Sequence, residues 1–160
     1  MQSPLARSIP HERLSNLDFL LGDGWGVETL YPPSSPPVQF QSVFSGSWEP
    51  CERFIKIDFF ANIPGLGEET YRALLTWSEK LACYKMWLFN SLEEEPLVLS
   101  GDLVRGRLTM VSEPWHMPWG LQRMRCTFSK LEDEGFEYLA ELWAPDGYSK
   151  FRTVVFRPIE

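Results

Sequence analysis

The fold is decided by the stretch Gly135-Phe-Glu-Tyr-Leu-Ala-Glu-Leu-Trp-Ala-Pro-Asp-Gly-Tyr-Ser-Lys-Phe-Arg-Thr-Val-Val-Phe-Arg157. Polar and apolar side chains alternate in it, and a period of two is typical of a β-strand with one buried face. The Asp-Gly pair in its middle is a strong signal for a tight hairpin turn. The stretch therefore predicts two antiparallel strands, Gly135–Ala144 and Tyr148–Arg157.

The same period of two extends back along the chain to Trp25. Gly, Pro, Asn, Asp and Ser divide this region into eight further strands. We expect these at Trp25–Tyr31, Val38–Trp48, Arg53–Asn62, Glu69–Ser78, Leu81–Asn90, Pro96–Asp102, Gly106–Ser112 and Leu121–Leu131. Parallel pairing needs crossovers of about a dozen residues, which most of the connections are too short to supply. The strands therefore form an antiparallel meander, with two longer proline-rich loops at residues 32–37 and 113–120.

One helix is expected ahead of the strands, over about residues 10–21. Ser8 is a suitable N-cap, Pro10 fits the first turn and Gly22 can end the helix. Four leucines at helical spacing form an apolar face: Leu14, Leu17, Leu20 and Leu21. A helix this short is marginal alone, so it should pack on the sheet.

A sheet of ten strands without covering helices must curl or split into two layers. Closing it into a barrel also removes its exposed edges. The predicted fold class is therefore all-β, a closed up-and-down antiparallel barrel in one domain spanning residues 1–160, and a β-sandwich is the alternative. The strand Leu81–Phe89 is apolar on both faces, which indicates a cover on the outside of the barrel, either the helix or a partner subunit.

Charge and cysteine content exclude several classes of partner. The net charge is −7 and the 15 basic residues are scattered, so no basic stripe is present for nucleic acid or an anionic membrane. No apolar run approaches the ~18 residues of a membrane span, and no secretory leader is visible. Cys51, Cys83 and Cys126 form no CxxC pair, so we expect buried thiols in a cytoplasmic protein and neither zinc nor disulfides.

Two segments resemble known families. Leu17-Asp-Phe-Leu-Leu-Gly-Asp-Gly-Trp25 looks like the calycin motif of a helix followed by G-x-W, and the final hairpin resembles that of a family of small lipocalin-like domains. The resemblance implies a barrel of about ten strands and no particular reaction. More distantly, the chain is similar to fatty-acid-binding-protein-like barrels and to nitrobindin, a haem-binding barrel, which shares Trp25 and Tyr31-Pro32. No histidine follows His116, and nitrobindin's alternating glycines are missing after Trp25, so haem is not expected.

Strand alternation then predicts which side chains point into the barrel. With Trp25 inward, as in calycins, Glu28 lies outside, and on the last strand Arg152 lies outside while Phe151, Val155 and Arg157 lie inside. Arg157 would stack on Trp25 as a structural plug at the base. The predicted ligand-binding lining of the lumen is Trp25, Tyr71, Trp77, Trp87, Met124, Tyr138 and Phe151.

Three residues of the second long loop, Trp115, His116 and Trp119, are placed at the barrel mouth. They are expected to pack on the rim or on a dimer partner, and a gating or metal-touching role for His116 is the alternative. With His11 as the other imidazole, the supply of metal ligands is poor. No catalytic residue and no metal site are predicted.

Three functions follow from these patterns. The leading one is non-catalytic binding of a small hydrophobic or amphipathic molecule in the lumen. The alternative is a plugged barrel that acts as a homodimerisation or protein-interaction module. The third is a lyase or isomerase that uses Tyr71, Tyr138 or an inward Arg72. A cavity above about 300 Å³ would favour ligand binding over a plugged barrel.

Overall fold

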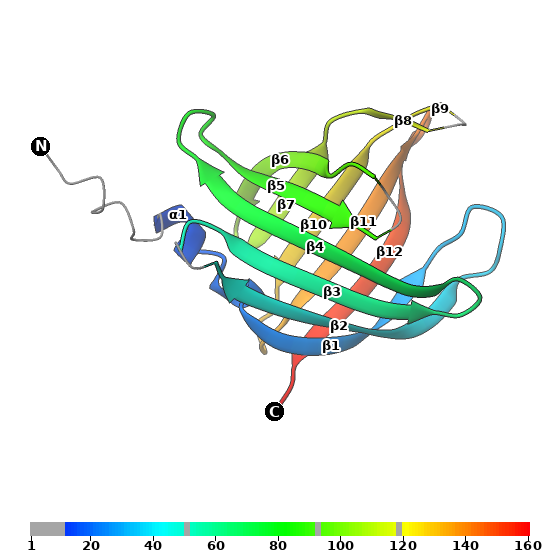
Figure 1. The fold of residues 1–160 in the computed structure, drawn as a ribbon, viewed down its shortest axis with the longest axis horizontal. Coiled ribbons are helices and arrows are strands. Elements are labelled where there is room, and N and C mark those ends of the chain that lie inside the picture. Colours follow the sequence, from blue (N-terminus) through cyan, green and yellow to red (C-terminus); the bar gives the residue numbers. More distant parts are fainter. Residues whose placement is uncertain (1–11, 50–51, 92–93, 118–119) are drawn as a thin grey trace, which may run out of the picture.

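Ten strands close into an antiparallel barrel in which each pairs with its neighbours along the chain and the last pairs with the first (Figure 1). The computed structural model describes residues 12–49, 52–91, 94–117 and 120–160. The barrel strands are β1 (Gly22–Leu30), β2 (Val38–Trp48), β3 (Ile55–Ile63), β4 (Gly67–Ser78), β5 (Cys83–Asn90), β6 (Leu97–Val104), β7 (Arg107–Ser112), β10 (Met124–Lys130), β11 (Phe136–Ala144) and β12 (Gly147–Pro158). The predicted fold class is confirmed, and the sandwich alternative is wrong.

The proline-rich segment after β7 holds a small hairpin that sequence reasoning missed. Its strands, β8 (Trp115–Met117) and β9 (Gly120–Gln122), pair with each other and stay outside the barrel sheet. The carbonyl of Arg123 accepts a hydrogen bond from the Trp143 backbone N–H, and the barrel strand resumes at Met124. The hairpin lies at the end of the barrel opposite the helix (Figure 1).

The helical segment is shorter and tighter than predicted. It consists of α1 (Glu12–Ser15) and a 3₁₀ turn, η2 (Asp18–Leu20). The backbone N–H groups of Leu17 and Leu20 bond to the carbonyls three residues earlier, and a spacing of three stacks Leu14, Leu17 and Leu20 on one side. All three are buried, so the segment caps one end of the barrel. The predicted N-cap, Ser8, lies outside the described residues, and no described helix is long and apolar enough to cross a membrane.

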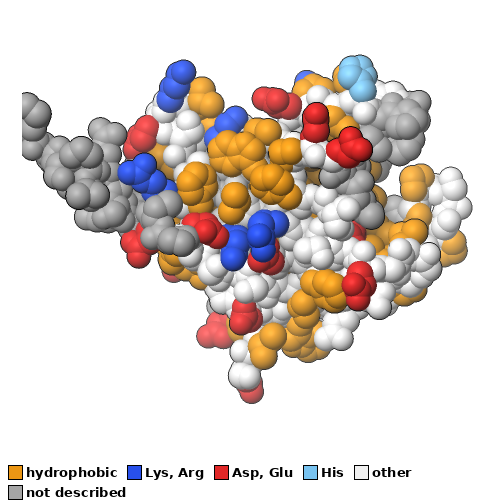
Figure 2. All heavy atoms as spheres, in the orientation of Figure 1, with side chains coloured by type: hydrophobic (Ala, Val, Ile, Leu, Met, Phe, Trp, Pro, Cys, Tyr) orange, Lys and Arg blue, Asp and Glu red, His pale blue; other side chains and the backbone are white. Residues whose placement is uncertain are grey.

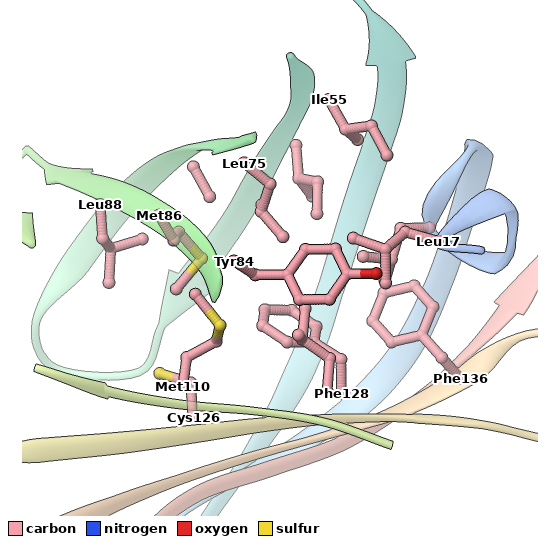
Figure 3. Packing of buried hydrophobic residues seen from close by; sticks show 14 of the residues in the cluster. Leu17, Ile55, Leu75, Tyr84, Met86, Leu88, Met110, Cys126, Phe128 and Phe136 are labelled. Atoms are coloured by element: carbon pink, nitrogen blue, oxygen red, sulfur yellow. The ribbon is translucent and has the colours of Figure 1, made fainter. Parts of the chain in front are cut away.

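The interior next to this cap is filled by side chains, which Figure 3 shows for part of the core. The rings of Phe44, Phe136 and Phe156 pack with centroids 4.8–5.2 Å apart, and we call these three the phenylalanine plug. Tyr84 points toward the helical segment, where its hydroxyl donates to the Arg13 carbonyl at 2.6 Å. This end of the barrel is closed by its own residues.

Close contacts from β2 and β12 accompany the inward face of β1. A Cβ at Gly24 would lie 2.2 Å from Phe44 Cε1, and one at Gly26 would lie 2.3 Å from the Val155 carbonyl oxygen, so both positions need glycine. The inward residues of β1 are therefore at positions 24, 26, 28 and 30. The prediction that Trp25 points into the lumen and Glu28 outward is wrong, because Trp25 is 45% exposed and Glu28 is 4% exposed.

The faces of β12 were also predicted wrongly, because a β-bulge interrupts the strand. Ala140 pairs with Arg152 and Glu141 with Lys150, which leaves Phe151 as an extra residue. Alternation is reset after the bulge, so Arg152, Val154 and Phe156 are buried. Val155 and Arg157, predicted inside, are on the outer face.

Candidate functional site: a charged cavity inside the barrel

Beyond the phenylalanine plug the barrel retains a cavity of about 30 Å³. Its apolar lining includes Phe59, Met86, Leu88, Met124, Phe128 and Tyr138, and its polar lining is Glu28, Ser42, Glu69, Tyr71 and Arg152. At about 10–15 Å³ for each water, the space holds one or two water-sized groups. That is about a tenth of the roughly 300 Å³ at the lower end of ordinary ligand pockets. Most of the lumen is therefore occupied by side chains, and the cavity is small and polar on one side.

Arg152 lies at the centre of the polar side and connects three strands. Its Nε donates to Glu28 Oε1 on β1, and its Nη1 donates to the Tyr71 hydroxyl on β4 at 2.7 Å. The guanidinium also lies over the Tyr71 ring, 5.0 Å from its centroid. The Arg152 and Glu28 side chains are 7% and 5% exposed, so this is a buried ion pair.

Glu69 is the second carboxylate at the cavity, and it is incompletely paired. Its Oε2 lies 2.9 Å from Arg152 Nη1, close enough for charge attraction. This approach lacks hydrogen-bond geometry, and Oε2 accepts no hydrogen bond from any described residue although it is buried. An unsatisfied buried acceptor costs about 1–3 kcal/mol. Glu69 Oε2 therefore has capacity for one more donor inside the cavity.

The cluster contains two acidic side chains and one basic side chain, together with the phenol of Tyr71. Burial by itself would lower the pKa of Arg152, but its interactions with Tyr71, Glu28 and Glu69 raise that pKa above its usual value, so the guanidinium stays charged. Burial raises the pKa of Tyr71 well above its usual value and outweighs the opposing effect of Arg152, so the phenol stays neutral. Two carboxylates then face one cation.

A neutral pair lies behind this cluster. Tyr138 lines the cavity and its hydroxyl is 3.4 Å from Cys126 Sγ. Burial raises the pKa of the Cys126 thiol to about 12 and raises that of Tyr138 well above its usual value. Cys126 is thus an unreactive buried thiol, as predicted, whereas Cys83 is partly exposed and Cys51 lies outside the described residues.

The structure brings together four of the seven predicted lining residues. Tyr71, Met124, Tyr138 and Phe151 all line the cavity. Trp77 packs against the core but at the helix end, where its ring contacts that of Tyr84 at 5.0 Å.

Two predicted lining residues, Trp25 and Trp87, are not in the lumen. Trp87 alternates with the buried Met86 and Leu88 and contacts Phe54 on the outside of the barrel, with ring centroids 6.4 Å apart. The predicted base plug of Trp25 and Arg157 is also wrong. The two residues are cross-strand partners but on the outer face, and Arg157 donates to Asp133 at 2.7 Å.

Sequence reasoning missed the charged residues of the site. Glu69 had a visible signal, because it shares strand parity with the predicted inward residue Tyr71. Glu28 also had one, since it continues the alternation of Gly24 and Gly26. Arg152 had no such signal, because the bulge at Phe151 reverses its expected side.

Of the predicted mouth residues, Trp115 and His116 do not line the cavity. Trp115 and His116 belong to β8, His116 is exposed, and Trp119 lies outside the described residues. Arg72, considered as an inward catalytic group, points outward and pairs with Asp58 at 2.6 Å. The described residues contain no group of three or more His, Cys, Asp or Glu suited to a metal ion. Haem does not fit the cavity either, because its lining includes no histidine and its volume is far too small.

Fold and site together define a closed, ten-stranded antiparallel β-barrel with a charged cluster inside its lumen. The chain is similar in structure to Rv2717c from M. tuberculosis, solved as a crystal structure, with a TM-score of 0.69. The match has 11% sequence identity and covers 95% of this chain and 100% of that chain, so it shows the fold alone. No family model matches the sequence, and no curated protein matches it.

Proposed function

We propose that the barrel binds a small amphipathic molecule without chemical change, with the polar group at Arg152, Glu28, Glu69 and Tyr71. The observation that carries this proposal is a buried ionic cluster beside unfilled space in an otherwise apolar interior. A buried ion pair is commonly no more stabilising than well-packed apolar residues of the same volume. The stability of the fold therefore does not explain why the cluster is present, whereas the binding of a polar group would explain it.

The lining can adapt to an occupant somewhat larger than the resting cavity. Met86 and Met124 both line it, and methionine side chains are unbranched and repack readily. The opposite end is fixed by the phenylalanine plug, so the enlargement is limited. A long-chain fatty acid is too large for this site, so the proposed ligands are compact molecules.

Native mass spectrometry of protein purified gently from its own host tests this proposal. We expect an extra mass that is lost on denaturation. Tyr71→Phe, which removes the hydroxyl next to Arg152 and keeps the ring, should lower the retained fraction at least fivefold. Tyr148→Phe is the matched control, because Tyr148 contacts Arg125 outside the cavity and should retain the ligand. A bare mass for the unmodified protein would contradict the proposal.

A second candidate function is supported by an apolar patch on the outer face of β4, β5 and β6. Leu74, Trp87 and Val98 are cross-strand neighbours, and Phe89 next to them is 41% exposed. Figure 2 shows the hydrophobic side chains gathered over these strands. Lys85 and the Asp58–Arg72 pair place both charge signs around the patch, so two copies can meet with opposite charges aligned. The partner that fits is a second copy of this chain.

Sedimentation velocity over a concentration series tests the dimer. We expect Phe89→Ser to weaken self-association at least tenfold, because it places a polar group in the patch. Trp143→Ser changes a side chain of similar exposure, 40%, on β11 and should leave association unchanged. A monomer at every concentration of the unmodified protein would rule this function out.

A further inference from the structure

We infer that the molecule held in the cavity is a small organic cation, a primary ammonium ion whose N–H groups donate to Glu69 Oε2. This inference rests on the proposed function and specifies its ligand class. Its first support is the unused acceptor: the Glu69 side chain is 8% exposed, and Oε2 has no hydrogen-bond donor among the described residues. A primary ammonium group carries three N–H donors, one of which can bond to Oε2.

The second support is the charge of the cluster. Arg152 forms its directed hydrogen bonds with Glu28 and Tyr71, which leaves the charge of Glu69 only partly compensated. Charged groups in a protein interior are normally paired, because an uncompensated buried charge is costly. A monocation restores neutrality to two carboxylates and one guanidinium.

The third support is the aromatic wall beside the carboxylate. The Phe59 and Tyr138 rings stack with centroids 5.7 Å apart, Phe128 lies 5.0 Å from Tyr138, and all three line the cavity. Phe151 lines it from the bulge. Aromatic faces attract ammonium groups, and this attraction is stronger where water is excluded.

The same arrangement disfavours anions. A carboxylate ligand would depend on the remaining N–H groups of Arg152, because Nε and one N–H of Nη1 already serve Glu28 and Tyr71. It would also lie near two carboxylates in a region shielded from solvent, where like charges repel strongly. The cavity should therefore bind ammonium ions more tightly than neutral molecules, and neutral molecules more tightly than anions.

The resting volume limits the size of the cation. About 30 Å³ accepts one or two water-sized groups, which corresponds to an ammonium head with a very short carbon chain. Ethylammonium, with three non-hydrogen atoms, is slightly larger than the resting space, so its binding already requires Met86 or Met124 to shift. It is the natural probe because ethanol and acetate have a closely similar size with neutral and negative heads. Longer amines require further repacking of both methionines.

The test is a titration of the full chain with ethylammonium, ethanol and acetate at constant ionic strength, followed by NMR chemical shifts of the lumen methionine methyl groups. We expect saturable shifts with ethylammonium, at least tenfold weaker binding of ethanol and none of acetate. Glu69→Gln should weaken ethylammonium binding at least tenfold without lowering the melting temperature, because Arg152 keeps Glu28. Glu141→Gln, in the outer Arg125–Glu141 pair, is the matched control and should bind normally.

The outcomes separate the two proposals. Acetate or ethanol binding as tightly as ethylammonium would overturn the ammonium assignment and leave lumen binding intact. Unchanged ethylammonium binding in Glu69→Gln, or a fall in its melting temperature as large as that of a variant lacking Arg152, would also overturn it. If none of the three probes binds and the purified protein carries no extra mass, lumen binding itself fails.

Discussion

Replacing Arg152 by methionine is expected to lower the free energy of unfolding by about 3–5 kcal/mol, as for other buried ion pairs that lose one partner. The substitution keeps most of the side-chain volume but leaves Glu28 and Glu69 buried without a cation. It also removes the donors that reach Glu28 on β1 and Tyr71 on β4. Urea unfolding followed by tryptophan fluorescence measures the loss.

The matched control is Arg72→Met on the outer face. Arg72 forms a two-pronged ion pair with Asp58, through contacts of 2.6 and 3.1 Å, but its side chain is 55% exposed. An exposed pair of this kind contributes about 0–1 kcal/mol. Adding Glu28→Gln and Glu69→Gln to Arg152→Met should recover most of the lost stability, because no buried charge then remains. Equal losses in Arg152→Met and Arg72→Met would show that the lumen cluster is not a buried ionic site.

The strand pattern of this chain could be predicted because its signals are local. Alternation and turn residues place Val38–Trp48 at its observed bounds, and they place most other strands within a few residues. Glu113–Gly120 shows the limit, since its short hairpin has too few residues for a period to be recognised. The prediction of one long helix failed for a related reason, because leucines spaced three apart fit a 3₁₀ turn as well as an α-helix.

The faces of the strands were harder to predict, because one local irregularity reverses a whole strand. On β12 the extra residue at Phe151 moves Arg152 from outside to inside. On β1 the inward pattern of Gly24, Gly26 and Glu28 depends on other strands. Phe44 of β2 fills the space above Gly24, and Val154 and Val155 of β12 approach Gly26. Neither effect can be read from the period of a single strand.

The residues of the candidate site show the same contrast between positions that a local pattern predicts and positions that depend on other strands. Met124 and Tyr138 line the cavity, on the side that alternation predicted, because β10 and β11 are regular up to the bulge. Glu28 and Arg152 were assigned to solvent because charged residues are usually exposed, and only the closed barrel shows that they pair with each other inside it. The cavity volume depends on how side chains from many strands fill the lumen, which no local pattern encodes.

Phe136→Ala is expected to destabilise the protein by about 3–5 kcal/mol, which is usual for a buried phenylalanine that leaves a void. Phe136 is fully buried, and its ring packs against Phe44 at 4.8 Å and Phe156 at 5.2 Å. No neighbouring backbone can collapse into the space, because the closed sheet surrounds it. Thermal and urea unfolding measure the loss. Phe60→Ala, at a position that is 42% exposed, should change stability by no more than about 0.5–1 kcal/mol.

This variant also tests whether the two ends of the lumen act independently. Phe136 does not line the charged cavity, whereas its neighbour Phe156 does. Under conditions where Phe136→Ala stays folded, ethylammonium affinity should therefore change by less than about threefold, as expected for sites that share no ligand contact. Loss of binding in a folded Phe136→Ala protein would show that Phe156 couples the plug to the cavity. In that case the plug would position the ligand site and would not merely close the end of the barrel.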